Sequence, residues 1–251
     1  MSKLITITSG KGGVGKTTTA INLGIALNSF GKEVIIVDAN LTTPNIGLHL
    51  GAPIVPISLN HVLSGKATIA DAMYEHESGT KIIPSSLSIN ELRKINHGKL
   101  KDVGKKLRKM AEYIIYDSAA GLGEEAIAAI EAADELIIVT NPEIPAVTDA
   151  LKTVKLAEQM GKPIRGVIVT KVKRSKIEMP ISNIRDMLEL PIIGVVPDDA
   201  KVQYALVSKS SIIDAYPKSK AALAYKNIAS RIISNTTYKK ESSFLDRLFY
   251  R

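Results

Sequence analysis

The stretch GKGGVGKT, residues 10–17, constrains the fold more than any other part of the sequence. It fits the phosphate-loop pattern G-x-x-x-x-G-K-[ST], and it lies between a strand-like run, LITIT, and a helix-like run, TTTAINLGIALNSF. In that context backbone N–H groups and the positive end of the helix dipole converge on one point, where they attract phosphate. The sequence therefore predicts a nucleotide site built from a strand, a loop and a helix.

Apolar, β-branched runs recur along the chain with helical stretches between them. Because these runs do not alternate apolar and polar residues, each strand is expected to be buried on both faces, as in a parallel sheet covered by helices. No break in composition divides the 251 residues. We predict one α/β P-loop NTPase domain over residues 1–235, with a doubly wound, mostly parallel sheet and helices on both faces. The predicted strands are residues 4–8, 33–38, 80–84, 112–117, 135–140, 164–170 and 191–196.

Composition excludes several classes of protein. The chain has no cysteine, which removes disulfides, cysteine-ligated zinc and the iron–sulfur carriers that share this kind of fold. No apolar run approaches the roughly 20 residues of a membrane span, and the chain enters its first strand without a charged-then-apolar leader. We therefore expect a cytoplasmic protein. The net charge of +8 favours acidic partners without choosing among them.

The chemistry of the loop follows from its residue types. Lys16 is expected to reach the β- and γ-phosphates, and the Thr17 hydroxyl is expected to coordinate Mg²⁺. Glycines allow the loop backbone to approach the phosphates closely. The nucleotide-binding residues predicted in this segment are Gly10, Lys11, Gly12, Gly13, Val14, Gly15, Lys16, Thr17 and Thr18.

The loop carries a second lysine, Lys11, and with it KGGVGKT resembles the deviant Walker A signature of the MinD/ParA ATPases. The resemblance implies that ATP and Mg²⁺ are the ligands and that two subunits form a sandwich around ATP. It also implies that Lys11 of each subunit contacts the nucleotide of the other. Dimerisation would then depend on nucleotide, because two such lysines repel each other without phosphates between them.

Two aspartates end strand-like runs, Asp38 in VIIVDAN and Asp117 in YIIYDSAAGL. The resemblance implies that Asp38 acts near Mg²⁺ and the attacking water, and that Asp117 holds Mg²⁺ as a Walker B residue, followed by Gly121 in a phosphate-sensing switch. The predicted metal-binding set is Thr17, Asp38 and Asp117, and the predicted catalytic set is Lys11, Lys16, Asp38 and Asn40.

Asn40 departs from the family pattern, which usually has a second acid at this position. An asparagine can donate and accept hydrogen bonds, but it cannot take up a proton usefully near neutral pH. We therefore hypothesise slow ATP hydrolysis and a long-lived ATP-bound state.

The resemblance places the base-reading loop at VVPDDA, with Pro197 and Asp198 near adenine. The other expected reader is an asparagine, and this sequence has Thr170 in its place. A threonine hydroxyl can reach a base edge, and no NKxD-type guanine reader is present, so ATP is favoured over GTP.

The end of the chain, SSFLDRLFYR, resembles the membrane-targeting helix of MinD. Phe244, Leu245, Leu248 and Phe249 would gather on one face of a helix. We expect residues 236–251 to form a linker and an amphipathic helix that binds anionic membrane at the inner face of the cell membrane, weakly alone and strongly when two tails are coupled. The alternative is that this stripe docks in a protein groove.

Two functions remain open at this stage. The first is a MinD-like peripheral membrane ATPase that positions other proteins, in division-site selection or a similar task, with an unidentified protein partner or activator. The alternative is a ParA-like partition ATPase that binds DNA non-specifically. Its best support is the basic segment at residues 99–109, although Leu100, Val103 and Leu107 recur there at helical spacing and predict an ordinary surface helix.

Overall fold

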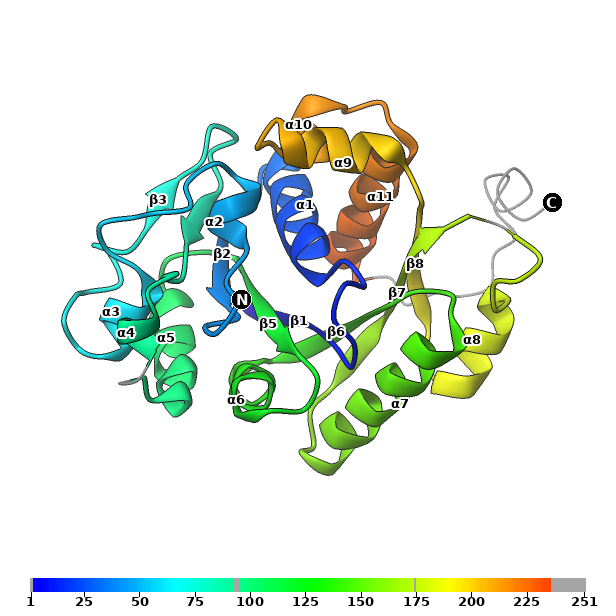
Figure 1. Ribbon diagram of the computed structural model, residues 1–251, viewed down its shortest axis with the longest axis horizontal. Helices are drawn as coiled ribbons and strands as arrows, with labels where there is room; N and C mark the ends of the chain where they lie inside the picture. Colours follow the sequence, from blue (N-terminus) through cyan, green and yellow to red (C-terminus); the bar gives the residue numbers. More distant parts are fainter. Residues whose placement is uncertain (1, 93–94, 174, 236–251) are drawn as a thin grey trace.

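The computed structural model describes residues 2–92, 95–173 and 175–235 of the chain. Within them a single sheet of eight strands has the order β3-β4-β2-β5-β1-β6-β7-β8 (Figure 1). All neighbouring strands are parallel except β3 and β4, which are antiparallel. The strands are β1 Lys3–Ser9, β2 Val34–Ala39, β3 Tyr74–Glu75, β4 Lys81–Ile83, β5 Tyr113–Ala120, β6 Glu135–Thr140, β7 Ile164–Val172 and β8 Ile192–Pro197.

The fold class predicted from the sequence is confirmed, and each of the seven predicted runs contains a strand. The sequence analysis missed β3, because two residues are too few to leave a periodic pattern. β3 closes one edge of the sheet and takes no part in the site described below.

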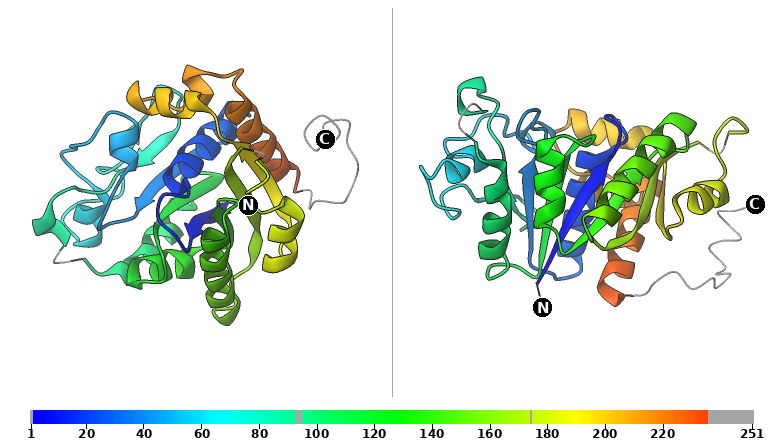
Figure 2. Two further views of the ribbon diagram at one scale, coloured as in Figure 1. Left: turned by 45° about the vertical axis from the view of Figure 1, so that its right-hand side comes forward. Right: turned by 90° about the horizontal axis from the view of Figure 1, so that it is seen from below.

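Helices cover both faces of the sheet. In Figures 1 and 2, α1 and α11 lie on one face, and α5, α6, α7 and α8 lie on the other. The helices are α1 Lys16–Ser29, α2 Ile46–His49, α3 Leu59–Leu63, α4 Ile89–Leu92, α5 Leu100–Leu107, α6 Glu124–Ala132, α7 Ile144–Gln159, α8 Ile181–Leu188, α9 Ala200–Val207, α10 Ile212–Ala215 and α11 Lys220–Ser234, with a 3₁₀ helix, η1, at His97–Lys99.

The central strand shows why its sequence is apolar throughout. Ile5 and Ile7 of β1 pack into the core shared with α1 and α11, whereas Leu4 packs into the core shared with α5 and α6. Thr6 is also fully buried on the α6 side, and its hydroxyl donates to the Ala129 carbonyl at 2.8 Å. The side chains of residues 4–7 are therefore buried on alternating faces of the sheet, as expected for a strand covered on both sides.

The position of β1 determines where a ligand can bind. β1 lies between β5 and β6. From β1 the chain first builds the edge that contains β2, β3, β4 and β5, and it then crosses to the other side of β1 to add β6, β7 and β8. Such a reversal opens a crevice at the carboxyl ends of the strands. The glycine-rich loop that follows β1 lies at this point.

The basic segment at residues 99–109 forms η1 and α5. As predicted, Leu100, Val103 and Leu107 are buried against the sheet. Several of the cations are engaged within the molecule: Lys105 pairs with Asp102 at 3.1 Å, and Arg108 pairs with Asp134 at 2.6 Å. The Lys99 ammonium donates to the Leu63 carbonyl at 2.9 Å. These contacts leave less free positive charge on this face than the sequence alone indicates.

No helix among the described residues combines the length and apolar character needed to cross a membrane. The predicted membrane-binding residues Phe244, Leu245, Leu248 and Phe249 lie outside the described residues.

Candidate functional site

The loop after β1 leads directly into α1, and the first turn of that helix is open to an anion. Gly15, the N-cap residue, has φ 93°, a left-handed conformation that favours glycine. No side chain caps the helix, and its first turn contains no acidic residue. The free N–H groups of α1 and its dipole therefore point at the loop without an internal partner, which is the arrangement of a phosphate site.

The loop is pressed against α7 at its start. A Cβ atom on Gly10 would lie 2.0 Å from the backbone oxygen of Asp149, so a larger residue would force the loop away from the helix. Gly12 and Gly13 are exposed at the tip, whereas Val14 is buried. The two ends of the loop are thus fixed by packing while its tip faces solvent.

Lys16 is the only lysine among the described residues that belongs to the buried set, with 8% of its surface exposed. Burial lowers the pKa of its ammonium, and the neighbouring Asp117 carboxylate opposes this shift. A bound phosphate, like the Asp117 carboxylate, would stabilise the charged form of this buried ammonium. Thr17 and Thr18 follow in the first turn of α1, where both are half-buried.

Asp38 and Asp117 lie side by side on neighbouring strands. They are register partners in the parallel pairing of β2 with β5, and Asp117 is also paired with Ile7. Register partners on parallel strands point to the same face, so both carboxylates point to the α1 side, where Ile7 packs. Both residues are fully buried. The structure therefore brings together the two aspartates that the sequence analysis singled out.

The environment of these carboxylates opposes their ionisation. Burial raises the pKa of Asp117 to about 6, although the Thr17 hydroxyl and the Lys16 ammonium oppose the rise. Burial also raises the pKa of Asp38 well above its usual range, and the Asp117 carboxylate raises it further. Two buried like charges at adjacent positions are unfavourable unless a cation joins them.

Asp117 and Asp38 differ in what already binds them. Neither oxygen of Asp117 accepts a well-aligned hydrogen bond from another described residue. Asp38 instead accepts backbone N–H groups from Asn45 and Ile46, both at 3.0 Å, and so caps α2.

The bare carboxylate of Asp117 beside the Thr17 hydroxyl fits Mg²⁺, which binds through one or two protein oxygens and completes its shell with water and phosphate. No cluster of three or more potential metal-ligating side chains exists among the described residues. A hard cation would therefore depend on nucleotide oxygens as well as on Asp117, with Asp38 nearby.

Asn40 is buried beside Asp38, and its side-chain amide is held by Thr43. Its amide nitrogen donates to the Thr43 carbonyl at 2.6 Å, and its amide oxygen accepts from the Thr43 hydroxyl at 3.0 Å. Its backbone N–H also contacts Asp38, at 3.3 Å. An asparagine is required for this pair of contacts, because an aspartate has no hydrogen to donate to the carbonyl.

Lys11 lies at the exposed rim of the loop. Its ammonium is 3.6 Å from the Glu143 carboxylate at the N-terminus of α7, and the two side chains are 42% and 58% exposed. An ion pair this exposed contributes little to stability, so Lys11 is free to exchange it for a stronger anion.

The far side of the loop is braced by two residues at the end of β7. Thr170 is 3% exposed, and its hydroxyl lies 2.5 Å from the Val14 carbonyl and 2.9 Å from the Asn141 side-chain oxygen. Lys171 has φ 55° and donates its ammonium to the Gly13 carbonyl at 2.7 Å. The structure thus places Thr170 beneath the loop, where its hydroxyl is engaged, and its role as a base reader stays a prediction.

The loop after β8 places Pro197 and Asp198 at the same edge of the sheet. Asp198 is exposed, and its carboxylate lies 3.6 Å from the Lys173 ammonium. The position suits a base-contacting loop, and the assignment of both residues to adenine stays a prediction.

Sequence reasoning did not assign Glu143, Asn141 or Lys171 to the site. Asn141 and Lys171 directly follow predicted strands, and the carboxyl ends of parallel strands meet at one edge. That signal was present for Asn141 and Lys171. The contact of Glu143 with Lys11 depends on how α7 packs against the loop, which no spacing in the sequence reveals.

Residues 5–212 match the family model described as the CobQ/CobB/MinD/ParA nucleotide binding domain. An uncharacterised ATP-binding protein of Methanocaldococcus jannaschii is 40% identical, over 98% of this chain and 95% of that protein. The septum site-determining protein MinD of Pyrococcus horikoshii, solved with Mg-ADP, superposes with a TM-score of 0.89 at 34% identity, covering 92% of this chain and 96% of that one. A MinD from Aquifex aeolicus, solved as a MinC:MinD cell division protein complex, has a TM-score of 0.85 at 29% identity, covering 96% and 99%.

Proposed function

The chain belongs to the CobQ/CobB/MinD/ParA family of nucleotide-binding domains, and from this premise we propose that it is a MinD-like ATPase. In this proposal it binds Mg-ATP, dimerises around it, attaches peripherally to the inner face of the cell membrane and positions other proteins there. The observation that carries the proposal is that the site holds charged groups whose charge is not fully compensated within the described structure. A bare buried carboxylate, Asp117, and a buried ammonium, Lys16, lie beneath a helix terminus that has no cap.

A nucleoside triphosphate with Mg²⁺ supplies a partner of opposite charge for each of these groups. Lys16 and the N–H groups of α1 would bind the phosphates, whereas Thr17 and Asp117 would hold the cation, with Asp38 beside it. The bound cation supplies charge neutralisation to the phosphoryl group that is transferred. The Mg-ADP in the similar Pyrococcus MinD supports this choice of ligand.

Lys11 supports the dimer. It is exposed at the rim of the proposed phosphate site, and among the described residues its ion-pair partner is Glu143, which is itself exposed. A second subunit facing this edge would receive the Lys11 ammonium at its own nucleotide. Two measurements test the proposed function: the rate of ATP hydrolysis, and the mass in solution with Mg²⁺ and a non-hydrolysable ATP analogue. A monomer under saturating analogue would contradict the sandwich arrangement.

Asn40 is proposed to slow hydrolysis, and Asn40→Asp is the direct test. We expect the aspartate variant to hydrolyse ATP about tenfold faster or more, because a carboxylate can orient and deprotonate water where an amide cannot. The structure indicates a cost in stability. The aspartate loses the hydrogen bond to the Thr43 carbonyl and adds a third carboxylate to the pair formed by Asp38 and Asp117. Steady-state turnover measured beside the melting temperature separates the two effects. A variant that stays folded but is no faster would refute the slow-hydrolysis hypothesis.

The membrane proposal rests on residues 236–251, and truncation after Asn235 tests it. We expect the full chain to sediment with anionic vesicles in the presence of Mg-ATP and to remain largely in the supernatant without it, since one short tail binds weakly. The truncated chain should stay in the supernatant in both conditions while it retains ATP hydrolysis. Equal sedimentation of the full and truncated chains would show that the tail is not the membrane anchor.

We also propose that a protein partner reads the nucleotide state. The similar MinD of Aquifex aeolicus was solved in complex with MinC, which supports a partner of some kind for this chain without identifying it. DNA is the less favoured partner. The basic face of α5, its best support in the sequence, is partly neutralised by Asp102 and Asp134.

A further inference from the structure

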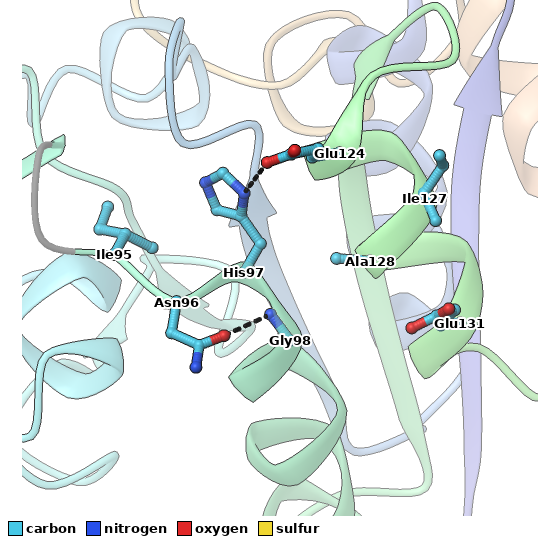
Figure 3. Close-up of a pocket in the computed structure, with 8 residues that line it drawn as sticks. All are labelled: Ile95, Asn96, His97, Gly98, Glu124, Ile127, Ala128 and Glu131. Atoms are coloured by element: carbon cyan, nitrogen blue, oxygen red, sulfur yellow. Dashed lines mark hydrogen bonds and ion pairs between the residues drawn. The ribbon is translucent and has the colours of Figure 1, made fainter.

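A pocket of about 490 Å³ lies beside the nucleotide site but outside it, between η1 and the outer face of α6. We refer to it as the η1–α6 pocket. One wall consists of residues 95–98, and the other is the side of α6 that carries Glu124, Ile127, Ala128 and Glu131 (Figure 3). None of these residues has a role in the site described above.

The lining of the η1–α6 pocket combines apolar and acidic groups. Figure 3 shows Ile95 and Ile127 on opposite walls, with Glu124 and Glu131 near the two ends of the α6 wall. Glu124 is 93% exposed, and its carboxylate is 3.9 Å from the His97 Nδ1 atom. Because that distance is long, Glu124 retains most of its capacity for a cation. Positive charge lies at the far end of α6, where the Lys162 ammonium donates to the Glu131 carbonyl at 2.6 Å. Burial lowers the pKa of Lys162, and Lys101 and Arg108 are close enough to lower it further. The Glu124 end is therefore the more acidic end of the pocket.

Acidic side chains beside apolar walls restrict which partners the pocket can bind. The chain has a net charge of +8, which disfavours cationic partners overall, and a local group of acidic side chains attracts them. The same acidic side chains repel phosphate, which disfavours nucleic acid and anionic lipid as occupants. The complementary ligand is a protein segment that presents lysine or arginine together with apolar side chains.

The η1–α6 pocket is connected to the loop that follows Asp38. The Glu125 carboxylate is 3.9 Å from the His97 Nε2 atom and also accepts the Thr42 hydroxyl. Thr42 follows Asn40 by two residues in the loop between β2 and α2. A ligand that displaces His97 would remove a neighbour of the Glu125 carboxylate. It would therefore change the hydrogen bond that this carboxylate accepts from the Thr42 hydroxyl. The N-terminal end of α6 is tied to the site as well, because the Gly121 N–H donates to the Ser9 carbonyl at 3.0 Å.

We propose that the η1–α6 pocket is a docking site for a cationic, amphipathic segment of a partner protein, and that His97, Glu125 and Thr42 couple its occupancy to the nucleotide site. The docking stands on the pocket alone, whereas the coupling rests on the proposed nucleotide function. The coupling must be reciprocal. If the bound segment changes the affinity for nucleotide by some factor, bound nucleotide changes the affinity for the segment by the same factor.

The docking is tested with a fluorescein-labelled hexapeptide of alternating leucine and arginine, followed by fluorescence anisotropy without nucleotide. We expect saturable binding to the wild type with a Kd below about 1 mM, and none by the corresponding glutamate–leucine peptide. The double variant Glu124→Gln/Glu131→Gln should weaken binding about fivefold or more, and Ile127→Arg, which places a cation in the pocket, should abolish it. Glu158→Gln, a matched change on the exposed surface of α7, should have no effect.

Several outcomes would overturn the docking. They are an absence of saturable binding by the arginine peptide, equal binding by the glutamate peptide, or unchanged binding in both pocket variants. Melting temperatures of the variants identify any that fail to fold, and either pocket variant is sufficient for the test.

The coupling is tested with a fluorescent ADP analogue and Mg²⁺. We expect saturating peptide to change the affinity for the analogue about fivefold or more, and Thr42→Val to remove this effect while leaving peptide binding intact. Peptide binding with no change in nucleotide affinity would refute the coupling and leave the docking standing. Failure of the wild type to bind the analogue at all would instead contradict the proposed function.

Discussion

A Lys11→Ala variant should remain monomeric in Mg-ATP, while its affinity for nucleotide stays close to that of the wild type. In the proposed site Lys16, Thr17 and the N-terminus of α1 contact the phosphates from within one subunit, so we expect nucleotide binding without Lys11. The exposed Lys11 ammonium, with Glu143 as its only close partner of opposite charge among the described residues, is the group available to a second subunit. We expect ATP turnover to fall about 10²–10³-fold, which is typical for loss of a cation that acts in the transition state.

The controls for this prediction come from the same part of the molecule. Lys152→Ala on α7 removes an exposed lysine that pairs with Asp149, and it should leave both dimerisation and turnover unchanged. Lys16→Ala should instead lose nucleotide binding in the monomer. Light scattering gives the mass, and titration with a fluorescent ATP analogue gives the affinity. Dimers of Lys11→Ala in Mg-ATP would show that the second lysine of the loop has no role between subunits.

An Asp117→Asn variant is expected to be more stable than the wild type when no ligand is bound, and to lose its response to Mg²⁺. The pKa of Asp117 rises from 3.8 to about 6 through burial, which corresponds to on the order of 3 kcal/mol of unfavourable free energy above pH 6. The neutral amide avoids this cost, although its own buried N–H groups lack partners and return part of the gain. We expect an increase of about 1–3 kcal/mol in unfolding free energy and a melting temperature higher by roughly 2 to 10 °C.

The dependence on pH identifies the cause of that stabilisation. Between about pH 4 and pH 6 the folded protein keeps the Asp117 proton that the unfolded chain has released, so the stability of the wild type falls as pH rises through this window. Asp38, whose pKa is also raised, acts in the same direction. The difference in unfolding free energy between Asp117→Asn and the wild type should therefore be small at pH 4 and largest above pH 6. Asp102→Asn, an exposed change on α5, should show no such profile.

The ligand reverses the order of stability. Mg²⁺ with nucleotide should raise the melting temperature of the wild type, because a ligand that binds only the folded state stabilises it by mass action. The same addition should have little effect on Asp117→Asn, which cannot supply a charged oxygen to the cation. A variant that is less stable than the wild type without ligand, or that keeps the full response to Mg²⁺, would contradict the role of Asp117.

The phosphate loop shows what local sequence is sufficient to predict. The pattern of glycine, lysine and threonine has one structural solution when a strand precedes it and a helix follows, so the placement of Lys16 and Thr17 did not depend on distant contacts. Asp38 and Asp117 were also singled out from local signals, because each ends a predicted buried strand. Their pairing in one register was not a local property. It arises because β5 enters the sheet between β2 and β1.

Thr170 shows what the sequence leaves undecided. The family resemblance predicts that it reads the base in the place of an asparagine; in the structure its hydroxyl lies under the loop against the Val14 carbonyl, and the base-reading role stays a prediction. The direction of that side chain depends on which strand lies next to β1 and on how deeply the loop sits, and neither is encoded near Thr170. The same reasoning applies to Asn40, whose two contacts with Thr43 depend on the path of the following loop.

By itself the sequence determined the class of fold, the phosphate loop and the residue types available for chemistry, because hydrophobic periodicity and glycine patterns act over a few neighbouring residues. Tertiary structure decided which of those residues meet. Among the described residues, it left Asp117 without a well-aligned hydrogen-bond partner while giving Asp38 two backbone partners. It also paired Lys11 with Glu143 and opened the η1–α6 pocket, which is linked to Thr42 through Glu125. These outcomes follow from strand order and helix packing, which bring together residues far apart in the chain.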